Sequence, residues 1–147
     1  MFKGRSKHNL DAKGRLAVPA RFKGALQGKA DDCLVLTNHF NCLWAFTRED
    51  WQVYEKKALE MSYLDPNALK YMRYFISGAQ ECPLKQGRIT IPPDLRRTAG
   101  LKKEVVLVGM MDKFEIWDQE KWDEEFLQDQ TDFLDISREL HQEKKAK

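Results

Sequence analysis

The apolar positions of this chain repeat one pattern twice, 73 residues apart. Residues 10–19 read LDAKGRLAVP and residues 83–92 read PLKQGRITIP, so each copy has a turn, an arginine, an apolar or β-branched run and a proline. Such a run suits a short pleated strand. The proline cannot donate a ladder hydrogen bond but fits the first turn of a helix. We therefore expect a strand and then a short helix in each copy, over residues 20–26 and 93–99, with Gly100 ending the second helix.

The repetition continues beyond this motif at a spacing of 71 residues. Residues 34–37 (LVLT) align with 105–108 (VVLV), and residues 43–46 (LWAF) align with 114–117 (FEIW). In both copies the first run is apolar enough for a buried strand, and the second returns after a turn. One mostly β unit is therefore used twice. We assign residues 5–51 to the first repeat and 81–124 to the second.

Helical patterns separate and follow the two repeats. Residues 47–50 (TRED) resemble a capping box, and residues 65–66 (DP) are a cap followed by a first-turn proline. Apolar residues at helical spacing follow both signals, which predicts a helical hairpin in a connector over residues 52–80. Another helix begins near Asp118 with apolar residues on one face and acids on the other. Residues 125–147 form its acidic C-terminal part and tail.

These elements predict a mainly β protein with helical additions, of the α+β class. A repeat of a few short strands cannot cover both faces of its sheet alone, so we expect the two copies to interleave into one closed β-barrel. Two tandem mini-sheets are the alternative. The length of 147 residues and the hydrophobic content of 42% fit one compact unit or two half-domains that share a core.

Composition limits where the protein works. No apolar run approaches the roughly 18 residues that span a membrane, and the N-terminus does not lead into the apolar stretch of a signal peptide. The three cysteines are an odd number in a chain without an export signal, which favours reduced thiols. We expect a soluble, cytoplasmic protein.

The charges are distributed unevenly along the chain. The net charge is only +2, but residues 1–29 carry +7, residues 84–103 carry +5 and residues 112–143 carry −9. The basic charge therefore lies on the repeated motifs, where it would attract a polyanion such as DNA. A lone basic run is more often an ordinary solvated face. Its occurrence at equivalent positions of two repeats favours the polyanion.

The first motif contains a pair of oppositely charged residues in which the acid can orient the arginine. Asp11 and Arg15 are four residues apart across a turn made by Gly14, close enough for the carboxylate to hold the guanidinium. An arginine held in this way can project a rigid fork at a phosphate or a guanine edge. The alternative is an internal ion pair that only steadies the turn. In the second copy Leu84 replaces the acid, so Arg88 is oriented differently or serves differently.

Further basic residues surround the two arginines. Lys3, Arg5, Lys7 and Lys13 lie before Arg15, and Lys85 lies before Arg88. In a DNA complex these side chains would neutralise phosphates and set the register, while Arg15 and Arg88 would give specificity. His8 and Asn9 would contact DNA or serve as turn residues.

Signals for catalysis are weak. Cys33, His39 and Cys42 fall within ten residues, but no paired CxxC motif and no evident fourth ligand accompany them, so ordinary core or loop residues are the better interpretation. No GxGxxG, P-loop or nucleophile-elbow pattern occurs. An enzymatic reading would rest on fold analogy alone. We expect no enzyme, no metal and no cofactor.

Four segments together resemble one known family. They are LDAKGRL at 10–16, QGRI at 86–89, GLKKEV at 100–105 and FEIW at 114–117. Through them the chain, from Met1 to about Trp122, resembles the bacterial MraZ family. That family is similar to the AbrB-type DNA binders, with two SpoVT-AbrB-type repeats in one chain. The departure is Leu84, where the family usually has a second acid, and it puts an equal role of the two turns in doubt.

The resemblance also implies a fold, an assembly and a DNA target that the residues alone do not indicate. It implies a pseudo-twofold, swapped-hairpin, double-psi-like barrel and ring-like homo-oligomers. It also implies binding to short G-rich direct repeats in double-stranded DNA, ahead of the division and cell-wall gene cluster. We therefore expect a cytoplasmic, nucleoid-associated, sequence-specific transcriptional regulator. The alternative is a ring-shaped scaffold whose acidic C-terminal helix docks another protein.

Overall fold

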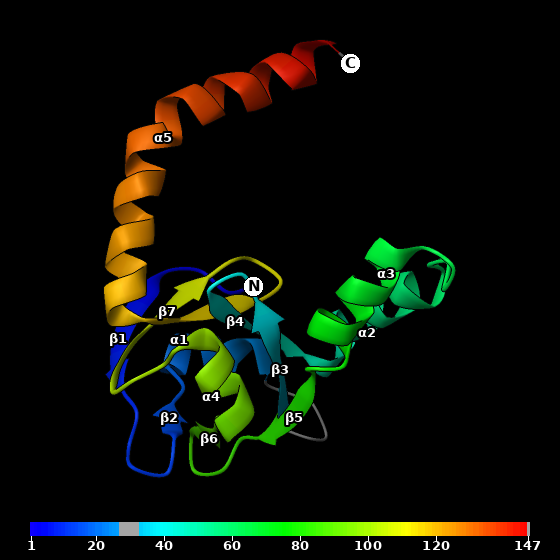
Figure 1. Cartoon of the computed structure of the whole chain (residues 1–147). Helices are drawn as coiled ribbons and strands as arrows, with labels where there is room; N and C mark the ends of the chain where they lie inside the picture. The colour runs from blue at the N-terminus through cyan, green and yellow to red at the C-terminus, as the bar shows by residue number, and fades with distance from the viewer. Residues whose placement is uncertain (27–32, 147) are drawn as a thin grey trace.

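The computed structural model describes residues 1–26 and 33–146 (Figure 1). The strands in this part of the chain are β1 (Arg5–Asn9), β2 (Arg15–Ala17), β3 (Cys33–His39), β4 (Cys42–Thr47), β5 (Gln80–Pro83), β6 (Arg88–Thr90), β7 (Glu104–Gly109) and β8 (Phe114–Asp118). The helices are α1 (Ala20–Lys23), η1 (Gly24–Leu26), α2 (Arg48–Leu59), α3 (Pro66–Tyr71), η2 (Met72–Ile76), α4 (Pro93–Ala99) and α5 (Gln119–Ala146). The fold is mainly β with helical additions, which confirms the predicted class.

The strands of the two repeats interleave. Six strands form one sheet in the order β1-β7-β8-β4-β3-β5, and β2 pairs with β6 in a separate two-stranded ribbon. Each outer strand therefore pairs with a strand of the other repeat. Trp44 lies opposite Glu115 at the sheet centre, and Leu16 lies opposite Ile89 in the ribbon. Both pairs join repeat-equivalent positions, so a pseudo-twofold axis relates the two copies.

The ladder does not close into the barrel that we expected. The sheet is open, because no hydrogen-bonded ladder joins its outer strands β1 and β5 in the described residues. The ribbon lies between these two strands, since β2 follows β1 and β6 follows β5 along the chain (Figure 1). Its strands are three residues long and end shortly before Pro19 and Pro92, which cannot donate a ladder hydrogen bond. The sheet therefore stays open, and buried side chains of the ribbon cover its inner face.

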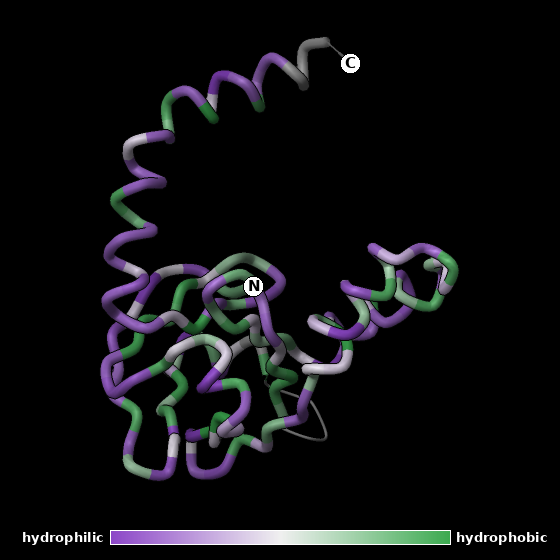
Figure 2. The backbone as a smooth tube through the Cα atoms, in the orientation of Figure 1, coloured by the Kyte–Doolittle hydropathy of each residue, from purple (hydrophilic) through white to green (hydrophobic). Residues whose placement is uncertain are grey.

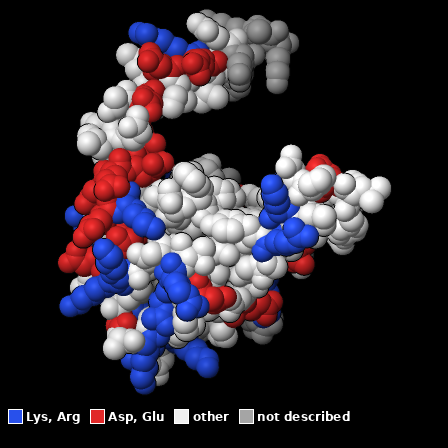
Figure 3. All heavy atoms as spheres, viewed as in Figure 1, with Lys and Arg blue, Asp and Glu red and all other residues white. Residues whose placement is uncertain are grey.

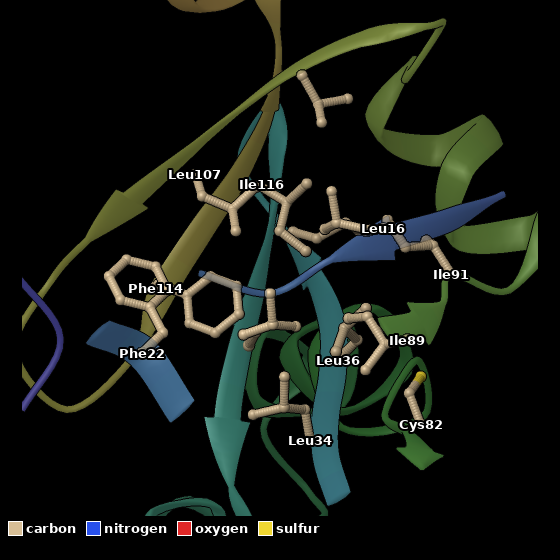
Figure 4. Packing of buried hydrophobic residues seen from close by; sticks show 14 of the residues in the cluster. Leu16, Phe22, Leu34, Leu36, Cys82, Ile89, Ile91, Leu107, Phe114 and Ile116 are labelled. Atoms are coloured by element: carbon tan, nitrogen blue, oxygen red, sulfur yellow. The ribbon is translucent and has the colours of Figure 1, made fainter. Parts of the chain in front are cut away.

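The two repeats share one hydrophobic core. Leu16 and Ile89 of the ribbon are at most 1% exposed and pack in the same buried cluster as the inner face of the sheet (Figure 4). At one end Phe2, Phe22 and Phe114 meet with ring centroids 4.9 to 5.3 Å apart. Because this cluster takes residues from both copies, neither repeat has a complete core of its own.

A short helix follows each ribbon strand, and α4 contacts β3 and β4 of the sheet. The helix expected over residues 93–99 is α4, and Gly100 ends it in the left-handed region with φ of +65°. The helix expected over residues 20–26 is α1 followed by a 3₁₀ turn. Residues 27–32 lie outside the described part of the chain.

The predicted helical hairpin is present. Thr47 caps α2 by accepting the N–H of Asp50 at 3.2 Å, and Asp65 caps α3 by accepting the N–H of Asn67 at 2.9 Å. The chain continues from α3 into a π-helical turn, η2. Its Phe75 packs on the outer face of the sheet with Phe46 and Trp51 and attaches the hairpin to the body.

We expect Thr47→Ala to lower the free energy of unfolding by about 1 kcal/mol, because the substitution removes the side-chain oxygen that accepts the Asp50 N–H at this cap. Chemical denaturation monitored by circular dichroism measures this change. Thr98→Ala is the control, because the exposed Thr98 hydroxyl only donates to a carbonyl of its own helix. If both variants have the same midpoint, the cap does not stabilise the hairpin.

The C-terminal helix α5 leaves the body after its first turns (Figure 1). Trp122 packs against Trp117 with ring centroids 5.8 Å apart, and the Arg5 guanidinium lies over Phe126 at 4.7 Å. Beyond this point Phe133 and Leu140 are 67% and 60% exposed, and Figure 2 shows apolar positions spaced between polar ones along the helix. None of the helices described is both long and apolar enough to cross a membrane.

Candidate nucleic-acid interface

Two turns project at the same end of the molecule. Turn 1 (residues 10–15) joins β1 to β2, and turn 2 (residues 83–88) joins β5 to β6 (Figure 1). The ribbon that follows the turns buries Leu16 and Ile89, so Arg15 and Arg88, each one residue earlier, project from its exposed face. The pairing places Arg15 opposite Thr90 and Arg88 opposite Ala17, on neighbouring strands.

Asp11 holds Arg15 in turn 1. One carboxylate oxygen accepts the backbone N–H groups of Lys13 and Arg15, both at 2.9 Å, and the other accepts Arg15 Nε at 2.5 Å. The backbone N–H of Arg15 is the main cause that keeps the pKa of Asp11 below its ordinary value, and the guanidinium adds to this effect. The Arg15 side chain is 48% exposed. The result is an oriented arginine that is open to a ligand.

Turn 2 is built differently. Gln86 and Gly87 have φ of +51° and +75°, and Lys85 and Arg88 exchange backbone hydrogen bonds at 2.8 and 2.9 Å, as in a two-residue type I′ hairpin turn. Leu84, which stands where turn 1 has its acid, packs against the core. No carboxylate of the described residues pairs with Arg88. The two turns therefore project at the same end of the molecule. Turn 1 orients its arginine with a carboxylate, whereas in the described residues turn 2 does not.

One groove brings the two arginines together. It has a volume of about 480 Å³. Its lining comes from β2, β5, β6 and turn 2: Arg15, Glu81, Cys82, Pro83, Lys85, Gln86, Arg88, Thr90 and Pro92. Figure 3 shows lysine and arginine side chains gathered at this end of the molecule and acidic side chains along α5. The groove therefore offers an anion two guanidiniums and a lysine, whereas α5 would repel it.

The structure places the predicted residues of β1 elsewhere. Arg5 lies over Trp122 and Phe126 of α5, and Lys7 lines a depression that also holds Glu104 and Asp123. His8 is half-buried, and burial is the main cause that lowers its pKa. Of the predicted DNA-binding residues, Lys13, Arg15, Lys85 and Arg88 lie on the turns and ribbon, whereas Lys3, Arg5 and Lys7 lie outside them.

Sequence reasoning missed two cations beside the turns. They are carried by α1 and α4: Lys23 lies against Gly87 of turn 2, and Arg96 lies against Gly14 of turn 1. A second depression, of about 450 Å³, lies between turn 1 and α4 and is lined by Asp11, Arg96, Arg97 and Lys102, among others. The signal in the sequence was the repeat itself, because Lys23 and Arg96 are separated by the same 73 residues as Arg15 and Arg88.

The residues considered for a metal site are divided between two places. His39 and Cys42 lie beside Glu115 on the outer face of the sheet, with ligand atoms within 4.8 Å of one another, whereas Cys33 lies on β3 beside β5. Both Glu115 oxygens accept an indole N–H at 2.9 Å, one from Trp44 and one from Trp117. Burial, followed by the charge of Glu115, raises the pKa of the Cys42 thiol. The arrangement is therefore a carboxylate that anchors two tryptophans beside a protonated thiol.

The comparisons with known proteins agree in one family. A sequence model described as "MraZ protein, putative antitoxin-like" matches residues 1–73 and 75–144. The chain is 45% identical over 136 residues to "Transcriptional regulator MraZ" of Syntrophobacter fumaroxidans, covering 92% of this chain and 91% of that protein. A protein of the same name from Natranaerobius thermophilus is 40% identical over 141 residues, covering 95% and 96%. The one from Desulforapulum autotrophicum is 45% identical over 126 residues, covering 85% of both chains.

Proposed function

The chain belongs to the MraZ family, and on this basis we propose that it is a sequence-specific DNA-binding transcriptional regulator that uses turn 1 and turn 2 to read DNA. The observation that carries the proposal is the exposed Arg15, held by Asp11 in a basic groove that it shares with Arg88. The names of the relatives, which are transcriptional regulators, support it.

The contacts of Arg15 suit a base edge. Asp11 engages Nε, so the two terminal Nη groups keep their N–H donors for a ligand. Such a fork matches O6 and N7 of guanine in the major groove. Arg88 has no carboxylate partner among the described residues, so its direction is less fixed. In this proposal Arg15 reads sequence, while Arg88, Lys13 and Lys85 contact the phosphate backbone.

Several copies are needed to read a useful length of DNA, since one subunit offers few base-reading side chains. We infer a homo-oligomeric ring whose neighbouring subunits present the same turn to successive direct repeats. The exposed apolar residues of α5 and of the hairpin support this: Phe133, Leu134 and Leu140 on one, Leu59, Tyr63 and Leu64 on the other. The target in this proposal is the division and cell-wall gene cluster, and the place of action is the cytoplasm, on the nucleoid.

The acidic charge of the C-terminal region favours a second function. Residues 112–143 carry a charge of −9, and most of these acids lie on α5, which is largely solvent-exposed. A ring scaffold that docks a basic protein partner on this helix is the alternative. Such a scaffold needs no enzymatic activity and no cofactor, and neither does the regulator.

The test is binding of the wild-type protein to its own upstream DNA and to scrambled DNA of equal length, over a salt series. We expect tighter binding to the upstream DNA at every salt concentration, and a fall in log affinity with log salt of about 0.9 per phosphate contact. Fluorescence anisotropy measures both quantities. Equal affinity for the two DNAs would leave a basic oligomer without sequence preference and would favour the scaffold.

A further inference from the structure

A cation of the second repeat lies flat against turn 1. Arg96 of α4 packs on Gly14, where a Cβ atom would come within 2.6 Å of Arg96 Cζ and 2.8 Å of its Nε and Nη1. Gly14 has φ of +79°, in the left-handed region that favours glycine. The absence of a side chain at Gly14 therefore serves two purposes, since it allows the turn and it admits the guanidinium plane.

The same contact occurs at the equivalent place of the other repeat. Lys23, at the end of α1, packs on Gly87 of turn 2, where a Cβ atom would come within 2.5 Å of Lys23 Nζ. Gly87 has φ of +75°. Lys23 and Arg96 are repeat-equivalent, as are Gly14 and Gly87. An incidental contact of a flexible surface side chain would not be expected to recur across the pseudo-twofold axis.

Backbone hydrogen bonds also join each turn glycine to the segment that leads to its covering cation. The carbonyl of Gly14 accepts the N–H of Ile91, and the carbonyl of Gly87 accepts the N–H of Val18, both at 2.9 Å. Ile91 and Val18 come directly after β6 and β2. Each turn glycine is therefore held by its carbonyl to the ribbon strand of the other repeat, and its open face is covered by the cation that follows that strand.

The charge environment sets Arg96 apart from an ordinary surface arginine. Its buried Nε finds no hydrogen-bond acceptor within residues 1–26 and 33–146. Turn 1 carries Lys13 and Arg15 besides Asp11, so its net charge is positive and a further cation is held beside it. Repulsion of this kind weakens the free protein and is relieved when a polyanion binds. Since no ion pair holds Arg96 within the part of the chain that the structure describes, its packing on Gly14 fixes its position.

From these contacts we propose that each repeat positions the DNA-reading turn of the other, with Arg96 as a positioning residue for Arg15 and Lys23 as its counterpart for turn 2. The inference rests on the proposed function. Arg96 acts through Gly14, which directly precedes Arg15, and its planar guanidinium restricts the turn more than the narrow ammonium of Lys23 restricts turn 2. The conformation of turn 1 therefore depends on the folding of both repeats.

The test uses charge-preserving variants of two neighbouring arginines in the full chain. Arg96→Lys removes the plane that covers Gly14 but keeps the charge. Arg97→Lys is the matched control on the same helix, because it also keeps the charge, while the three atoms nearest to a Cβ at Gly14 all belong to Arg96. We expect Arg96→Lys to lower the ratio of affinities for upstream and scrambled DNA at least about fivefold, the lower end of what one positioned arginine contact gives. We expect the salt dependence to stay unchanged in both variants, and the ratio to stay unchanged in Arg97→Lys.

A second readout does not depend on DNA. In the free protein, amide hydrogen exchange at Lys13, Gly14 and Arg15 is expected to be faster in Arg96→Lys and unchanged in Arg97→Lys, because the turn has lost its cover. Equal exchange in both variants and in the wild type would overturn the positioning role. If exchange changes while the wild type shows no preference for upstream DNA, the positioning role stands and the proposed DNA reading fails.

Discussion

Replacing Arg15 with alanine is expected to abolish the preference for upstream DNA while leaving the protein folded. The side chain is half exposed and contributes nothing to the core, and the contacts it loses are those with Asp11. One arginine contact to a guanine edge is worth roughly 1 to 3 kcal/mol per subunit. In an oligomer that presents the same turn several times the loss is multiplied, because each weak contact reinforces the next. Anisotropy titrations with upstream and scrambled DNA measure the effect.

The second turn supplies the matched control for this experiment. Arg88→Ala removes the equivalent arginine from a turn that lacks the carboxylate, so we expect it to weaken binding to both DNAs by a similar factor and to reduce the salt slope. Circular dichroism and native mass spectrometry check that both variants keep the fold and the assembly. A loss of sequence preference in Arg88→Ala but not in Arg15→Ala would exchange the roles of the two turns.

The repeated motif made most of the element order predictable. Strand, proline and helix were read correctly around Gly87-Arg88, and α4 has the expected bounds because proline and glycine signal both of its ends. The caps at Thr47 and Asp65 were equally readable. Signals of this kind are local, because a few residues determine the backbone conformation whatever packs around them.

Closure of the barrel was not predictable in the same way. The expectation rested on the need to cover an apolar sheet face, and the core meets that need through Leu16 and Ile89 without a continuous ladder. Periodicity identifies which side chains are buried, but it does not determine whether the covering strands also join the sheet by hydrogen bonds. Closure depends on strand length, and the ribbon strands of three residues are too short for it.

The site was predictable as far as its contacts are local. Asp11 and Arg15 are four residues apart and meet as expected. Arg5 and Lys7 were counted with them because they are basic and close in sequence, but a strand directs its side chains to its own neighbours, and here those lie on α5 and β7. Arg96 was missed for the opposite reason, since it reaches Gly14 from far along the chain. Charge counts along a sequence do not show which element a side chain faces.

Replacing Phe133 with glutamate is expected to dissociate the oligomer and to lower the affinity for DNA with several repeats by about 100-fold. Phe133 lies on the part of α5 beyond the body and is 67% exposed, in line with Phe126 and Leu140 at heptad spacing. A row of exposed apolar residues on an isolated helix is unfavourable in water unless a partner covers it. Loss of the assembly removes the effective concentration that links one turn to the next, which is worth 10² to 10⁴ in affinity. Native mass spectrometry and anisotropy on DNA with one or several repeats measure the two effects.

The matched control adds the same charge to the opposite side of the same helix. Gln128 is exposed and lies five residues before Phe133, so the rotation of 100° per residue places it about 140° around the helix axis. Gln128→Glu should keep both the oligomer and the affinity. Affinity for a single repeat should be the same in Phe133→Glu as in the wild type, because turn 1 is far from this part of α5. If Phe133→Glu keeps the oligomer, α5 is not the subunit contact, and its exposed acidic surface is then available for the protein partner of the alternative function.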